Sequence, residues 1–200
     1  MNSFQLFASP WWVNFLIVIP VLLFVYWRKN KLKISFKLLL FITIFAIAFG
    51  YLENACVIYL RAGTGLLPGY LKSLSEIQRQ SIGTYNQLLL QKSLPMSLLI
   101  VEFFREIATM IMLLGIAFIA VRKLKERVAI FLWTFAIWDI FYYVFLYLLV
   151  RWPEKPTTMD VLFLIPQPWF AQVWFPILIS LLTLLAVIIN VKRGKKDLKN

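Results

Sequence analysis

The chain of 200 residues is 62% hydrophobic and only 15% charged, and it has a formal net charge of +12. Soluble domains are about 45–50% apolar and about 25% charged, so this composition excludes an ordinary water-soluble fold. The single cysteine, Cys56, and the absence of histidine exclude an intramolecular disulfide, the usual histidine-ligated zinc and haem sites, and Ser–His or Cys–His nucleophiles. Apolar stretches of about 20 residues recur, and each is long enough to cross a bilayer as a helix.

The first predicted span covers residues 11–27, with two tryptophans at one end and a Tyr-Trp pair at the other, as at membrane interfaces. Positive charge follows this span, and no small-residue cleavage site is present, so we expect a retained helix and not a secretory signal. Pro20, near its centre, predicts a kink. The second predicted span covers residues 36–60.

An external segment, residues 62–95, is predicted after the second span, and Ser73 and Glu76 within it suggest a capping box before a short interfacial helix. The third, fourth and fifth predicted spans cover residues 97–121, 128–150 and 174–191. The second external segment, residues 151–173, is apolar but contains four prolines. It contains too few apolar residues to span the bilayer, and its prolines disfavour a regular helix. We therefore expect an interfacial or shallow re-entrant cap.

Lysine and arginine gather in three clusters that directly adjoin the spans. The clusters are Arg28, Lys29, Lys31 and Lys33; Arg122, Lys123, Lys125 and Arg127; and Lys192, Arg193, Lys195, Lys196 and Lys199. Five spans place all three clusters on one side, which the positive-inside rule assigns to the cytoplasm. The prediction is one all-α integral membrane domain over residues 1–200, multi-pass in a cell inner membrane, with its N-terminus outside and its C-terminus in the cytoplasm. The clusters favour anionic lipids as partners and not nucleic acid.

Five charged residues fall deep inside the predicted spans, all in the half of the bilayer that faces outward: Glu53, Glu102, Arg105, Glu106 and Asp139. A charge near a helix centre costs about 2.5–3.5 kcal/mol, so these side chains are expected to face protein or water. Helical spacing brings Arg105 within reach of Glu102 and Glu106. Tyr142 and Tyr143 follow Asp139 by three and four residues, so their hydroxyls are predicted to flank that acid.

Four acids and one intramembrane arginine leave an excess of negative charge, which predicts an outward-facing acidic pocket. Such a pocket would bind or translocate a proton, a cation or a small polar solute. One alternative is an intramembrane or lipid-modifying enzyme in which the carboxylates act as general acids and bases. Another is an assembly subunit whose charges form structural ion pairs, as a homo-oligomer or with a partner membrane protein. These residues do not decide whether the protein is an enzyme.

No cofactor or metal site is predicted. Di-metal sites in helical bundles use Glu-x-x-His, and the corresponding run from Glu102 has an arginine that repels cations. Gly50 and Gly115 are predicted to allow close helix packing.

Three runs carry a resemblance to known proteins: Glu102–Glu106 (EFFRE), Trp138–Tyr143 (WDIFYY) and Leu162–Trp169 (LFLIPQPW). Over roughly its C-terminal half the chain resembles a group of bacterial five-helix integral membrane proteins with no assigned activity. The resemblance implies the five-helix arrangement and a bacterial cytoplasmic membrane, and it implies no activity.

Overall fold

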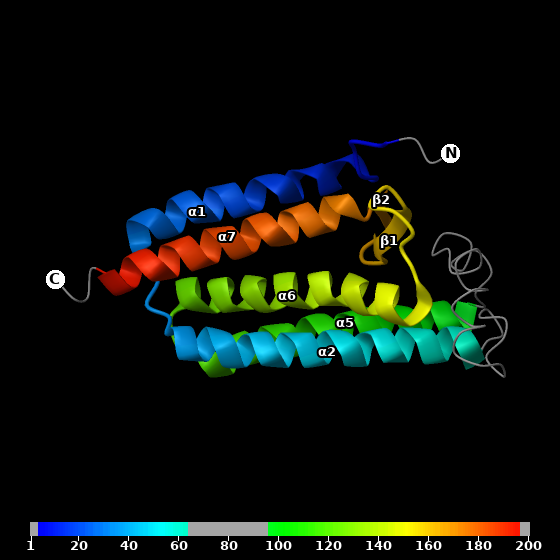
Figure 1. Ribbon diagram of the computed structural model, residues 1–200, viewed down its shortest axis with the longest axis horizontal. Coiled ribbons are helices and arrows are strands. Elements are labelled where there is room, and N and C mark those ends of the chain that lie inside the picture. The colour runs from blue at the N-terminus through cyan, green and yellow to red at the C-terminus, as the bar shows by residue number, and fades with distance from the viewer. Residues whose placement is uncertain (1–3, 64–95, 197–200) are drawn as a thin grey trace.

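The computed structural model describes residues 4–63 and 96–196, and within them five helices are long and apolar enough to cross a membrane. They are a 3₁₀ helix η1 (Trp11–Ile17) that continues as α1 (Val18–Asn30), then α2 (Phe36–Gly63), α5 (Met96–Ala120), α6 (Leu124–Val150) and α7 (Trp174–Lys196) (Figure 1). The predicted all-α bundle of five membrane-length helices is therefore confirmed. The direction of the helices across the membrane stays a prediction. The capping box at Ser73 and Glu76 lies outside the described residues.

The irregularity in the first span differs from the one predicted at Pro20. The chain is a 3₁₀ helix up to Ile17 and a continuous α-helix from Val18 to Asn30, so Pro20 lies in the first α-helical turn. Proline is favoured there because its fixed φ suits the helix and its missing N–H has no intrahelical acceptor to lose.

Helix α6 is the centre of the bundle, because it packs against α2, α5 and α7, while α1 packs along α7 (Figure 1). Helices α2 and α6 come close at Gly50, where an added Cβ would lie 3.3 Å from the Trp138 carbonyl oxygen. This is the close packing predicted for Gly50. The same prediction is wrong for Gly115, since an added Cβ there would meet nothing within 4 Å.

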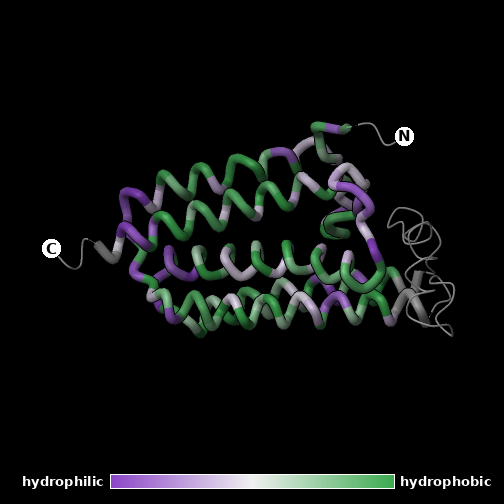
Figure 2. The backbone as a smooth tube through the Cα atoms, viewed as in Figure 1, coloured by the Kyte–Doolittle hydropathy of each residue, from purple (hydrophilic) through white to green (hydrophobic). Residues whose placement is uncertain are grey.

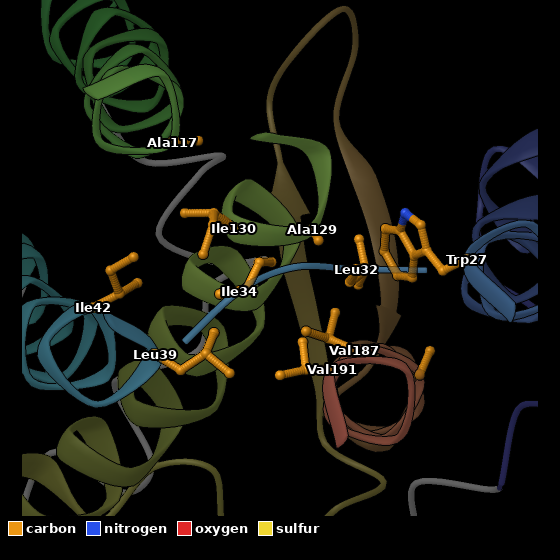
Figure 3. Close-up of a cluster of buried hydrophobic side chains, with 11 residues drawn as sticks. Trp27, Leu32, Ile34, Leu39, Ile42, Ala117, Ala129, Ile130, Val187 and Val191 are labelled. Carbon is orange, nitrogen blue, oxygen red and sulfur yellow. The ribbon is translucent and has the colours of Figure 1, made fainter. Parts of the chain in front are cut away.

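One end of the bundle is closed by a core of buried apolar side chains, to which α1, α2, α5, α6 and α7 all contribute (Figure 3). Its fully buried members include Trp27, Leu32, Ile130 and Val187. The described members of the three basic clusters gather at this same end, where the tube is strongly hydrophilic (Figure 2). The Lys125 ammonium donates hydrogen bonds to the carbonyls of Asn30 and Lys31 there, which satisfies acceptors that the end of α1 leaves open.

The other end carries a β-hairpin, which sequence analysis did not predict. Strand β1 (Met159–Phe163) pairs antiparallel with β2 (Trp169–Gln172), and the register shifts between Val161 and Phe163. The proline-rich turn joins the two strands. The N-terminal segment adds one bridge at Ser9, whose N–H and carbonyl both bond to Phe170 (2.8 and 2.6 Å). Exposed strand edges do not occur in lipid, so a hairpin next to the spans needs to rest on protein or line a cavity.

Candidate functional site: an acidic cavity under the hairpin

A cavity of about 130 Å³ lies between α5, α6, α7 and the hairpin, and we call it the acidic cavity. Nine of its lining residues are polar or charged: Glu102, Arg105, Glu106, Thr109, Asp139, Tyr142, Tyr143, Asp160 and Ser180. Six of the seven residues singled out from the sequence are among them. The seventh, Glu53 of α2, does not line the cavity but contacts Arg105 and Thr109 at its wall.

Arg105 is the centre of an ion-pair network that joins α2 to α5. Its guanidinium pairs with Glu53 and with Glu102, and the Nη2–Oε2 distance to Glu102 is 2.9 Å. The Thr109 hydroxyl donates to the second oxygen of Glu53 at 2.7 Å. Glu53 and Glu102 are each only 4% exposed, so both acids are held by a cation that is already paired twice. The predicted pairing with Glu102 is present, whereas Arg105 pairs with Glu53 and not with Glu106.

Glu106 and Asp139 are the two half-buried carboxylates that face the acidic cavity without an ion pair among the described residues. Glu106 Oε2 accepts the backbone N–H of Leu164, at the hairpin turn, at 2.9 Å. Asp139 Oδ2 accepts the hydroxyl of Ser180, on α7, at 2.8 Å. Each acid thus receives one neutral hydrogen bond, which orients it, and Arg105 acts on Glu106 only at longer range, without forming an ion pair with it.

The Tyr143 hydroxyl interacts electrostatically with Asp139, in line with the prediction, but it donates its hydrogen bond to another acid. Its hydroxyl donates to Asp160 Oδ2 at 2.7 Å, and Asp160 also accepts the backbone N–H of Val161 at 2.8 Å. Both side chains are buried. Tyr142 lines the cavity, and its backbone carbonyl accepts the Asn54 amide at 3.1 Å. The hydrogen bond from Tyr143 to Asp160 therefore links α6 to the hairpin.

Three polar residues of the cavity, Thr109, Asp160 and Ser180, were not among the predicted site residues. Asp160 lies in a segment read as an external cap, although an acid directly before the apolar run VLFLI is a sequence signal that this segment enters the protein. Ser180 carries no such signal, because a serine in an apolar helix is common. Its role is visible only once α6 and α7 are placed side by side.

The cavity and its wall contain five carboxyl groups and one guanidinium, that of Arg105. The carboxyl groups belong to Glu53, Glu102, Glu106, Asp139 and Asp160. Arg105 is the only cationic residue among the described lining residues. Ionised acids in a site of low dielectric need protons or a bound cation to balance them. In the described part of the chain, no three Asp, Glu, His or Cys side chains are grouped closely enough to hold a metal ion.

The remaining lining residues are apolar, and five of these thirteen are aromatic. Phe135 and Trp138 of α6 contact each other at 5.5 Å between ring centroids, and Phe163 and Trp169 of the hairpin do the same at 5.5 Å. Phe135 also stacks on Phe163 at 6.3 Å, so the rings form a continuous row from helix to hairpin. The indole N–H groups of Trp138 and Trp169 are buried, and neither has an acceptor among the described residues.

Comparisons with protein families, curated proteins and solved structures find no match to this chain. Function is therefore inferred from the acidic cavity alone.

Proposed function

We propose that this multi-pass membrane protein binds a small cation in the acidic cavity, in the half of the membrane that faces outward. The observation that supports this most directly is the pair of Glu106 and Asp139. Both carboxylates line the cavity from different helices, and each has one neutral hydrogen-bond donor and no ion pair among the described residues. A cation between these two acids would balance charge that Arg105, already paired with Glu53 and Glu102, does not neutralise by an ion pair.

The size of the cavity limits the ligand. An apolar cavity of about 150 Å³ accommodates a benzene molecule, so the 130 Å³ here suit a ligand of about six non-hydrogen atoms or an ion with a few waters. A lipid molecule or a large solute does not fit as a whole. Whether binding leads to translocation depends on how Leu164 and the rest of the hairpin move, because the hairpin closes one side of the cavity.

The test is a calorimetric titration of the purified full chain in nanodiscs with sodium, potassium, ammonium and tetramethylammonium chlorides. We expect at least one cation to bind, and we expect Glu106→Gln with Asp139→Asn to weaken that binding by about 30-fold or more, because two charged partners are removed from a desolvated site. Glu154→Gln is the matched control, since Glu154 is an exposed carboxylate away from the cavity. Absence of binding by every cation, or equal binding by the double variant, would contradict the proposal.

The outward direction has a separate test. In a Cys56→Ser background, single cysteines replace Lys155, beside the hairpin, or Arg28, at the basic end; both positions are exposed. A maleimide that does not cross membranes should label Lys155→Cys and not Arg28→Cys in intact cells. The reverse pattern would place the acidic cavity on the cytoplasmic side.

A further inference from the structure

We infer that the bound cation is a small organic ammonium ion that also carries an oxygen, such as choline or ethanolamine. The inference rests on the proposed function and names the chemical class of its ligand. Three features carry it: cavity carboxylates that come from separate helices, aromatic rings in the cavity wall, and two lining tryptophans whose buried indole N–H groups have no acceptor among the described residues.

The carboxylates suit a diffuse charge better than a compact one. A small metal ion needs several oxygens within about 2–2.6 Å, and so a cluster of acids on one point. No such cluster of three exists among the described residues, and Glu106 and Asp139 reach the cavity from separate helices. An alkylammonium ion spreads its charge over its methyl or methylene groups, so it can sit between acids that do not converge.

The aromatic row supplies the second half of such a site. Phe135, Trp138 and Trp169 all line the cavity next to the acids. Ammonium groups are attracted to aromatic ring faces, and aromatic rings around a carboxylate-rich space are the usual setting for quaternary ammonium ligands. The apolar groups of an alkylammonium ion gain from burial against these rings, whereas a sodium or potassium ion has no such groups and needs oxygen ligands in place of its lost water.

The buried indole N–H groups are the reason to expect an oxygen atom in the ligand. Trp138 is 8% exposed and lines the cavity, as does Trp169, and the Nε1 atoms of both are buried without an acceptor in the described part of the chain. A buried N–H group without an acceptor is unfavourable. A ligand that carries an ether, ester or hydroxyl oxygen beside its ammonium group can accept from an indole while its nitrogen faces the carboxylates.

This ligand chemistry has two possible sources, a free amino alcohol and the headgroup of phosphatidylethanolamine. The test therefore begins with the full chain in nanodiscs of phosphatidylglycerol alone, which contain no amine. Three probes are titrated by calorimetry: choline, tetramethylammonium, and the neutral alcohol that has carbon in place of the choline nitrogen. We expect choline to bind about 10-fold or more tightly than the neutral alcohol, because only choline has a charge for the carboxylates.

The variant Trp138→Phe with Trp169→Phe keeps aromatic rings and removes both N–H groups. It should weaken choline by about 3- to 10-fold, the effect of losing a neutral hydrogen bond, and should leave tetramethylammonium affinity nearly unchanged. Trp133→Phe is the control, since the Trp133 indole donates to Thr43 outside the cavity at 2.9 Å. Each single variant serves as a second measurement if the double variant does not fold.

Titration with phosphatidylethanolamine added to the nanodiscs separates the sources. If the affinity for choline falls as this lipid increases, the lipid headgroup competes for the site and is the source of the ligand. If the affinity is unchanged, the ligand is a free amino alcohol. Choline that binds no more tightly than the neutral alcohol, while potassium or sodium does bind, overturns the inference and leaves the proposed function standing. If no cation binds at all, both fail.

Discussion

The two ends of the bundle are built on opposite principles. At the basic end, apolar side chains from all five helices interlock, and the ends of the helices find hydrogen-bond partners in neighbouring loops. At the hairpin end, five carboxyl groups, one guanidinium and a row of aromatic rings surround an internal space. Lipid is as apolar as a leucine side chain, so packing alone can hold helices together in a membrane. The charged groups of the acidic cavity are therefore not needed to hold the helices together.

Within the hairpin end, the acids divide into two groups. Glu53 and Glu102 are deeply buried and share Arg105, which is the arrangement of a structural ion-pair network. Glu106 and Asp139 are half-buried and face the cavity with one hydrogen bond each. The first group would stabilise the bundle and the second would bind ligand. Variants that separate stability from binding test this division.

The largest effect on stability is expected for Arg105→Ala. It leaves Glu53 and Glu102 buried without their cation, and breaking a buried ion pair by removing one partner costs roughly 3–5 kcal/mol. The free energy of unfolding can be measured by tryptophan fluorescence in mixed micelles of increasing sodium dodecyl sulfate content. Glu154→Gln is the surface control. A loss below about 1 kcal/mol would show that the network does not stabilise the fold.

A somewhat smaller loss is expected for Ile130→Ala at the basic end. Ile130 is fully buried in the apolar core, and its truncation leaves a cavity that costs roughly 2–3 kcal/mol, less than the largest values in soluble proteins because lipid also solvates apolar groups. The same unfolding titration measures it. Ligand affinity should not change, because Ile130 is remote from the acidic cavity. A coupled loss of affinity would show that the two ends are not independent.

Gly194→Ala tests how tightly the basic end is closed. An added Cβ would overlap the Leu32 carbonyl oxygen, so α7 or the loop before α2 has to move, at a cost of about 1–2 kcal/mol. Gly115→Ala is the matched control, because its Cβ meets open space and alanine favours the helix by up to about 1 kcal/mol. Opposite signs in the two unfolding energies are the expected result, and equal values would argue against the close contact.

The helices and most of the charged residues of the site could be predicted from the sequence. The contacts that could not be predicted were missed for physical reasons. The spans are visible because a bilayer demands about 20 apolar residues in a row, and the acids stand out because charge inside a span is costly. The Arg105–Glu53 pair could not be predicted, since helical spacing shows only neighbours on one helix. Asp160 was missed with its hairpin: two short apolar runs around the turn that holds Pro166 and Pro168 are a hairpin signal, but the prolines were used only to exclude a helix.

The smallest effect on stability, and the sharpest test of the division, is expected for Asp139→Asn. The amide oxygen still accepts the Ser180 hydroxyl, and the variant removes a charge that has no ion pair among the described residues, so the unfolding energy should stay within about 1 kcal/mol of the wild-type value. Cation affinity should fall, because the ligand loses one of its two carboxylates. Ile130→Ala is expected to do the reverse, with lower stability and unchanged affinity. If Asp139→Asn instead lowers stability as much as Arg105→Ala and leaves affinity intact, Asp139 belongs with the structural network, and the acidic cavity is part of the bundle's packing.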